Sequence, residues 1–212
     1  IGVTLGISNA KEVTGTLLGS SNKIENVQTT AAKNYTLSGT NSQMATTWNE
    51  AVKYSVENNV NVKVVLGANW TAQSDATLTT TFGSGDGFTD GRILVPADCN
   101  ITLDLNGKTI NRALSTVIPY GECIFINGGV MNLVDTKYNS ALVASLDTVE
   151  KINNAAIGKI TGGKTGVEIN KNGSAISIYN NAVLNMYGGV IYNNKHNSHA
   201  GHSGAVGMGG YA

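Results

Sequence analysis

The sequence predicts an all-β solenoid with a short capping helix near its N-terminal end, and three observations predict this fold. Apolar and polar residues alternate with the period of a β-strand through much of the chain, a glycine-centred phrase recurs along the second half, and turn-forming residues are abundant. The 212 residues include 26 Gly and only 2 Pro. Because Gly and Asn adopt the positive φ angles of tight turns at little cost, this composition suits many short strands joined by turns.

The charge of the chain is low and balanced. Charged residues make up 13% of the sequence, and 14 Lys and Arg offset 14 Asp and Glu to a formal net charge of zero. We therefore expect neither nucleic acid nor an anionic membrane surface as a partner. No run approaches the roughly 18 apolar residues of a membrane span. The sequence starts at Ile1 without a signal peptide, so we expect a processed or trimmed segment.

The first part of the chain predicts a polar N-terminal segment followed by one helix. Residues 1–40 are rich in Thr, Ser, Gly and Asn, which is typical of a leader, a linker or an N-terminal strand segment ahead of a single domain at 41–212. A helix is predicted at about 47–58, where Thr47 and Glu50 have the spacing of a capping box. Its apolar face consists of Trp48, Ala51, Val52 and Val56. Since such a stripe must be buried, we expect this helix to cap the N-terminal end of the solenoid.

Short strands are predicted through the rest of the chain. Alternation starts at Val60, and from residue 92 onward every strong pattern has a period of two, as in Ile101, Leu103 and Leu105. Residues 142–157 are the exception, because they are compatible with a helical turn.

A repeated phrase organises the second half. It occurs as Leu105–Ile110, Ile126–Met131, Ile160–Lys164 and Met186–Ile191. The offsets are 21, 34 and 26 residues (106 to 127, 127 to 161, 161 to 187), within the range of solenoid repeats. Stacked turns would bury a shared core and let an Asn bond to its counterpart one turn away. Residues 203–211 read as the start of another turn, so we expect the natural chain to continue past Ala212.

Four segments carry a resemblance to a known family. They are Thr47–Val52 (TWNEAV), Val62–Trp70 (VKVVLGANW), Ile101–Ile110 (ITLDLNGKTI) and Leu184–Ile191 (LNMYGGVI). Over residues 46–212 the chain resembles pectate-lyase-like modules in large surface proteins of Gram-positive and gut bacteria. The resemblance implies a right-handed parallel β-helix, secretion, and anchoring to the cell wall through a region outside this segment. It implies an adhesin-like role and little about chemistry, because one fold hosts many functions.

An enzyme that acts on polysaccharides needs suitably placed carboxylates, so these residues indicate whether the chain could be one. Glycosidases need two carboxyl groups about 5–9.5 Å apart, and the resemblance implies that lyases of this fold need an Asp cluster for calcium and an Arg or Lys base. The candidate catalytic residues are Asp104 and Arg112. Asp104 lies on the opposite side of its strand from Leu103 and Leu105, so we expect it to point outward, with Arg112 one turn corner away.

Two segments are candidates for metal binding. His196, His199 and His202 gather in what reads as one loop, and imidazoles are common ligands of transition metals. The favoured alternative is a solvated loop. Residues 83–91 place Asp86 and Asp90 among glycines, which could hold calcium, although a plain turn is favoured.

Two further patterns have a structural and a functional interpretation. Residues 158–165 match the P-loop pattern, but the sequence after them predicts a strand where a P-loop has a helix, so a turn of the solenoid is favoured. Cys99 and Cys123 are the only cysteines. Two buried thiols in neighbouring turns are favoured, and a disulfide is the alternative in an oxidising compartment.

Three tyrosines complete the set of candidate ligand residues. If Tyr179, Tyr187 and Tyr192 point outward on successive turns, they form a ladder suited to a glycan chain, whereas inward tyrosines fill the core. The sequence as a whole favours a secreted or cell-surface structural, adhesin-like module without catalysis, whose partners are surface glycans or proteins. The alternatives are a polysaccharide lyase or glycoside hydrolase, and a glycan-binding module.

Overall fold

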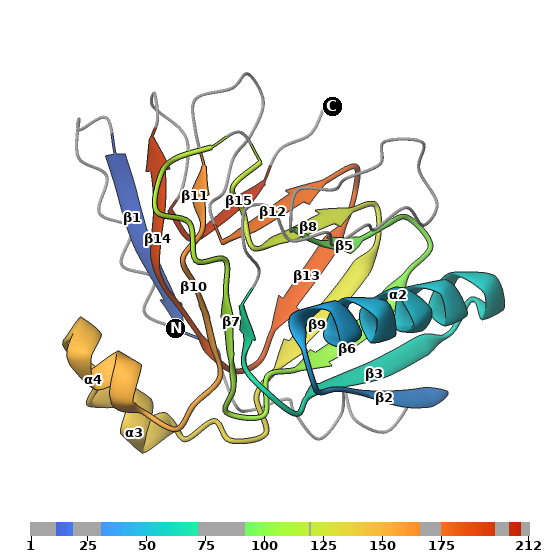
Figure 1. Ribbon diagram of the computed structural model, residues 1–212, viewed down its shortest axis with the longest axis horizontal. Coiled ribbons are helices and arrows are strands. Elements are labelled where there is room, and N and C mark those ends of the chain that lie inside the picture. Colours follow the sequence, from blue (N-terminus) through green and yellow to red (C-terminus); the bar gives the residue numbers. More distant parts are fainter. Residues whose placement is uncertain are drawn as a thin grey trace.

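The computed structural model describes residues 12–18, 31–71, 92–118, 120–165, 175–197 and 204–208. Within these residues the protein consists mainly of short parallel β-strands with a few helices, which confirms the all-β prediction at this level. The strands form three sheets (Figure 1).

Within each sheet the strands lie in the following order, from one edge to the other. Sheet I contains β2 (Lys33–Leu37), β3 (Asn61–Leu66), β6 (Asn100–Asp104), β9 (Val130–Val134) and β13 (Val183–Met186). Sheet II contains β4 (Trp70–Thr71), β7 (Thr109–Asn111), β10 (Lys159–Thr161), β14 (Val190–Asn197) and β1 (Glu12–Leu18), with β11 (Lys164–Thr165) also paired to β14. Sheet III contains β5 (Ile93–Val95), β8 (Ile124–Asn127), β12 (Ile176–Tyr179) and β15 (Val206–Met208).

In the described part of the chain, the strands pass through the sheets in the order I, II, III four times, and each such passage is called a round. The rounds are β3–β4–β5, β6–β7–β8, β9–β10–β12 and β13–β14–β15. Strands of consecutive rounds pair in parallel, so that Val64 lies beside Leu103 and Leu103 beside Leu133. Apolar side chains therefore stack on one another in the interior, and one apolar cluster draws residues from all three sheets.

The glycine-centred phrase does not mark equivalent places in these rounds. Leu105–Ile110 and Met186–Ile191 join sheet I to sheet II, whereas Ile126–Met131 joins sheet III to sheet I. The spacing measured on sheet I, from Asn61 to Asn100, Val130 and Val183, is 39, 30 and 53 residues (100 − 61, 130 − 100, 183 − 130). The spacing of the phrase therefore did not predict the length of the rounds, because Gly-Gly is favourable in any tight turn, whichever two strands the turn joins.

Helix α2 (Asn41–Asn58) is the predicted helix, but it begins six residues before Thr47. Its N-cap is Thr40, whose hydroxyl accepts a hydrogen bond from the Gln43 amide while the Gln43 side chain accepts one from the Thr40 amide. The capping box therefore lies seven residues, about two turns, upstream of the predicted pair (47 − 40), in a polar stretch without an apolar stripe.

The same helix covers the first round. Its buried face contacts β2, β3, β4 and β6, and Figure 1 shows it beside β2 and β3. The Trp48 indole Nε1 donates to the carbonyl of Leu94 on β5 (3.0 Å), and Asn41 Oδ1 accepts from the Thr71 amide on β4 (3.2 Å). Side chains of the helix thus satisfy backbone groups of sheets II and III, which explains how one helix can close this end of the core.

Two short helices lie in the connection between β9 and β10. They are α3 (Ser140–Ala144) and α4 (Val149–Asn154), which confirms the helical turn predicted within residues 142–157. They pack on sheet II through a small second core made of Val143, Ile152, Ile157, Val190 and Tyr192. The buried Lys159 ammonium donates to the carbonyls of Ile152, Asn153 and Ala155 at 2.7–3.1 Å, which satisfies the C-terminal end of α4.

Two strands come from the predicted N-terminal segment. β2 extends sheet I in parallel, from the pair Lys33–Val62 to the pair Leu37–Leu66. β1 pairs with the opposite end of the stack, where it runs antiparallel to β14. It makes the one antiparallel pair among the strands described above.

Candidate functional site

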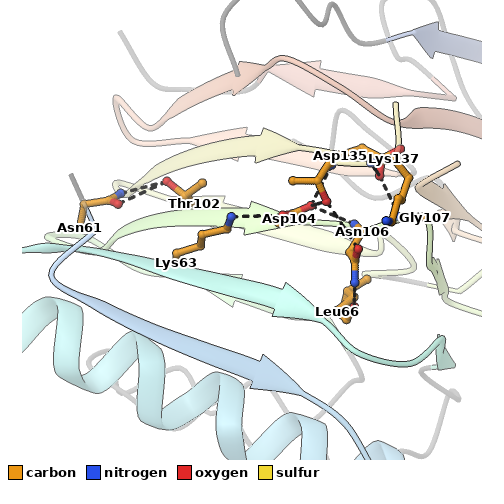
Figure 2. Close-up of polar contacts among 10 residues, drawn as sticks. Asn61, Lys63, Leu66, Thr102, Asp104, Asn106, Gly107, Asp135 and Lys137 are labelled. Carbon is orange, nitrogen blue, oxygen red and sulfur yellow. Dashed lines mark hydrogen bonds and ion pairs between the residues drawn. The ribbon is translucent and has the colours of Figure 1, made fainter. Parts of the chain in front are cut away.

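The candidate site lies at the corner where strands of sheet I end and the chain turns toward sheet II (Figure 2). Asp104 is the last residue of β6, and its carboxylate is 2% exposed. Oδ1 accepts from the amide of Asn106 (2.9 Å) and from the amide and hydroxyl of Thr136 (3.0 and 3.2 Å). Oδ2 lies 3.3 Å from Nζ of Lys63, on the preceding round. The carboxylate is therefore bonded to three rounds at once.

A second carboxylate occupies the equivalent corner one round later. Asp135 follows β9 and is fully buried. Oδ1 accepts from the amides of Gly107 (2.8 Å) and Lys137 (3.1 Å), and Oδ2 accepts from the amide of Gly158 (2.6 Å). Asp104 and Asp135 thus share one pattern: each binds the amide two residues ahead in its own turn and an amide of a neighbouring round.

The turn between these carboxylates depends on left-handed backbone. Asn106 and Gly107 have φ angles of 46° and 71°. Asn and Gly are the residues that adopt this region most readily, so the Asp-Leu-Asn-Gly phrase of the sequence is the local code for this corner. Asn106 also donates from Nδ2 to the Leu66 carbonyl of the preceding round (3.0 Å).

Asp104 points away from the apolar interior, as predicted, but its side chain is not exposed to solvent. The side chain does lie on the face away from Leu103 and Leu105, which are part of the interior cluster. The turn at Thr136 and the Lys63 side chain bind it there and bury it. The alternation of residues predicts on which face of a strand a side chain lies. Whether that face is exposed to solvent depends on the neighbouring rounds.

Arg112 lies in a different group of buried polar residues. It is fully buried, and its Nε donates to the carbonyl of Glu122 (3.2 Å). The Glu122 carboxylate binds Arg92, with Oε1 2.7 Å from Nη1, and both side chains are 1% exposed. The Arg92 guanidinium lies over the rings of Tyr120 and Phe125, 4.5 and 4.9 Å from their centroids. Asp104 and Arg112 are therefore bound to separate sets of partners and do not form the predicted catalytic pair.

Asparagine side chains bridge consecutive rounds, as predicted. Nδ2 donates to Oδ1 in the pairs Asn61–Asn100 (2.7 Å), Asn180–Asn127 (2.6 Å) and Asn185–Asn132 (3.0 Å). Thr102 joins this set, because its hydroxyl accepts from Asn61 and from Asn132. These bonds cross from strand to strand perpendicular to the chain, so they add to the backbone ladder.

The three candidate tyrosines do not line one face. Tyr179 ends β12 in sheet III and packs edge-on against Phe125, with ring centroids 5.4 Å apart. Tyr187 lies half-buried in the turn between β13 and β14. Tyr192 is buried on β14 in sheet II, where its hydroxyl donates to Asn153 Oδ1 of α4 (2.5 Å). The three tyrosines therefore do not form the ladder that was one of the two alternatives, because each belongs to a different sheet or turn.

The predicted histidine loop is wrong at its first member. His196 lies on β14, buried between β1 and β11, where it pairs with Val13 and Thr165. His199, His202 and residues 83–91 lie outside the described residues. In the described part of the chain, no group of three or more His, Cys, Asp and Glu side chains could hold a metal ion.

Residues 158–165 form strand, turn and strand, in agreement with the favoured interpretation. Lys159–Thr161 and Lys164–Thr165 are both strands of sheet II. The amide of Gly158 is bonded to Asp135 and that of Gly163 to Asn194 Oδ1 (2.8 Å), so two amides that a P-loop offers to phosphate are already used.

The two cysteines are buried as free thiols. Burial raises the pKa of both Cys99 and Cys123 from 9.0 to about 12. The Cys123 thiol also donates to the Thr161 carbonyl at 3.3 Å.

We expect neither thiol to react with Ellman's reagent in the native protein at about pH 8, since the thiolate is the reactive form. Both should react after unfolding in urea. Because folding raises the thiol pKa, their contribution to stability is complete below pH 9 and is lost as the pH rises toward 12. Urea unfolding measured across this pH range shows whether the free energy of unfolding falls as the pH rises. Cys123→Ala is the control, and its free energy of unfolding should fall less over the same range. Rapid modification of the native protein would contradict the prediction.

Comparison with known proteins adds no identity to this geometry. No protein-family model, curated protein or solved structure matches the chain. Among the helices of the described residues, none is both long and apolar enough to cross a membrane.

Proposed function

We propose that this chain is a right-handed parallel β-helix module of a secreted or cell-surface protein, and that it serves as a rigid structural, adhesin-like segment without catalysis. The single observation that carries this proposal is that the buried carboxylates bind groups within the stack of rounds. Asp104 and Asp135 accept seven hydrogen-bond and ion-pair contacts between them, all from groups of their own or a neighbouring round.

The stacking of the rounds supports the solenoid part of the proposal. Each round contributes one strand to each sheet, and each pairs in parallel register with its predecessor. In a solenoid every repeat contacts only its neighbours, so stiffness depends on the bonds between successive repeats. Here those bonds include backbone ladders, stacked apolar residues, amide pairs and the two corner carboxylates.

The chemistry of the candidate residues supports a structural role. A general acid or base must reach its substrate within hydrogen-bond distance. Asp104 and Arg112 are both buried, and both are bonded within the stack. The resemblance to surface modules and the low charge support secretion and a role at the cell surface, with surface glycans or proteins as partners.

The decisive experiment is a degradation assay on a panel of polysaccharides that includes polyuronates, with and without calcium. New reducing ends and unsaturated products are measured against a heat-denatured sample of the same protein. We expect no difference between the native and denatured samples on any substrate. Product formation that requires the native fold would overturn the structural role, and its loss in Asp104→Asn or Arg112→Lys would assign it to a lyase or hydrolase.

A further inference from the structure

The strand β1 connects two places that are far apart in sequence. It pairs with β14 through Glu12–Asn197, Val13–His196 and Thr14–Lys195, and continues to Leu18–Val190. The first of these pairs joins residues separated by 185 positions (197 − 12). Three complete rounds and the strands β13 and β14 of the fourth therefore lie inside one loop of chain that a single strand pair closes.

This placement determines how tension reaches the stack. A force that enters before Glu12 and leaves after Asn197 acts on the β1–β14 pair and, beyond Asn197, on the three-residue pairing of β15 with β12. Once β15 has separated from β12, and while the β1–β14 pair holds, the rounds between Glu12 and Asn197 carry none of that force. The pair is antiparallel, so Glu12 and Asn197 lie at the same end of the ladder. Tension then opens its hydrogen bonds one after another, as in a zipper, instead of straining all of them at once.

The two strands of this pair are held unequally. β14 is anchored on its other side, where Val190 and Ile191 pair with β10, and Lys195 and His196 pair with β11. The buried Asn194 side chain adds bonds to the carbonyl of Ile160 and the amide of Gly163. β1 lies at the edge of sheet II, and its pairing is interrupted by a register shift between Gly15 and Leu17. A bulge of this kind breaks the regular ladder, so β1 is the strand that separates.

We propose that β1 is a strap that opens at low tension while the rounds remain folded. Release of the strap lengthens the chain in a first step and passes tension to the stack only in a second. The inference deepens the proposed function, because a stepwise response to tension matters in a segment that holds a surface protein away from its anchor.

The test is single-molecule stretching of the full chain from handles at its two ends, with a covalent lock on the strap. Thr14→Cys together with Lys195→Cys places two thiols on facing residues. Facing residues of antiparallel strands have Cα atoms about 4.5–5.5 Å apart, within the range of a disulfide. The native Cys99 and Cys123 are buried and do not compete for this bond.

Besides the separation of the short strand β15, which lies outside the strap, we expect two events in the unlocked protein. The first, at lower force, stretches the 21 residues from Glu12 to Lys33 (33 − 12) by roughly 70 Å. The second unfolds the rounds. In the oxidised locked variant both of these events disappear and the separation of β15 remains, because the span of 181 positions from 14 to 195 (195 − 14) is shielded. That removes about 630 Å of extension, and a reductant restores both events.

Two outcomes would overturn the strap. One is an unlocked protein in which β1 and the rounds open together, in a single event at one force. The other is a locked variant that extends as far as the unlocked one, or whose cysteines do not cross-link within one chain. Glu12→Cys with Asn197→Cys, at the loaded end of the ladder, is the second lock if the first variant does not fold. These results are independent of the degradation assay, so failure of the strap is distinguishable from failure of the structural role.

Discussion

Glu122→Gln is expected to destabilise the fold by about 3–5 kcal/mol, because it removes the carboxylate charge that faces the buried Arg92 guanidinium. Both side chains are almost completely shielded from water, so solvent cannot replace the lost charge. Glutamine keeps the shape of the side chain and an oxygen that can accept a hydrogen bond. The loss of stability in this variant therefore measures the effect of removing the charge. Urea unfolding followed by circular dichroism measures it.

Two variants make this result specific to a buried pair. Glu57→Gln removes the carboxylate of the exposed pair Lys53–Glu57, whose side chains are 57% and 54% exposed, and should leave the unfolding midpoint unchanged. The double variant Arg92→Met with Glu122→Leu should recover most of the loss, since an apolar pair of similar volume needs no compensating charge. The interpretation fails if Glu122→Gln unfolds at the same urea concentration as the wild type.

Asp135→Ala is expected to cost about 3 kcal/mol or more, because three backbone amides lose their acceptor together. The amides belong to Gly107, Lys137 and Gly158, and each unsatisfied buried donor costs about 1–3 kcal/mol. Asp135→Asn should lose less stability, since the side-chain oxygen of Asn still accepts hydrogen bonds in place of one carboxylate oxygen. Urea unfolding gives the free energy, and amide hydrogen exchange should accelerate at Gly107 and Gly158 before it does so elsewhere in the described strands.

The control for this substitution is Asp147→Ala. Asp147 is exposed, and its carboxylate pairs with Lys151 on the surface, which lowers its pKa through that hydrogen bond. Its removal should leave both the midpoint and the exchange rates of Gly107 and Gly158 unchanged. If Asp135→Ala behaves like Asp147→Ala, the corner carboxylates do not hold the rounds together.

Much of the local structure could be predicted from the sequence. Alternation at Val62, Val64 and Leu66 predicted a strand with these residues inside, and all three are fully buried. The apolar stripe of α2 predicted a helix that caps the core, and Trp48 lies in that core. Asparagine pairs between rounds followed from the idea of stacked turns. Each of these inferences depends on residues within one short segment.

The candidate site was predicted only in part. Asp104 was singled out because it belongs to the Asp-Leu-Asn-Gly phrase, whereas the second carboxylate, Asp135, was not. An Asp that precedes a turn commonly accepts a hydrogen bond from the amide two residues later, and this pattern could have identified Asp135. The pairing of Arg92 with Glu122 was missed because the two residues are 30 positions apart and no pattern in the sequence links them. His196 was assigned to a loop because no local signal shows that β14 continues to Asn197 between two partner strands.

By itself the sequence determined the strand period, the turn chemistry, the helix that covers the first round and the low charge of the chain. Those properties are local, since backbone preference and alternation act over a few residues. Only the tertiary structure decided which rounds become neighbours, that the carboxylates at the corners are buried, and that β1 returns to close the far edge of sheet II. The physical reason is that connections of unequal length set the register of each round, and a side chain's burial depends on the round stacked against it.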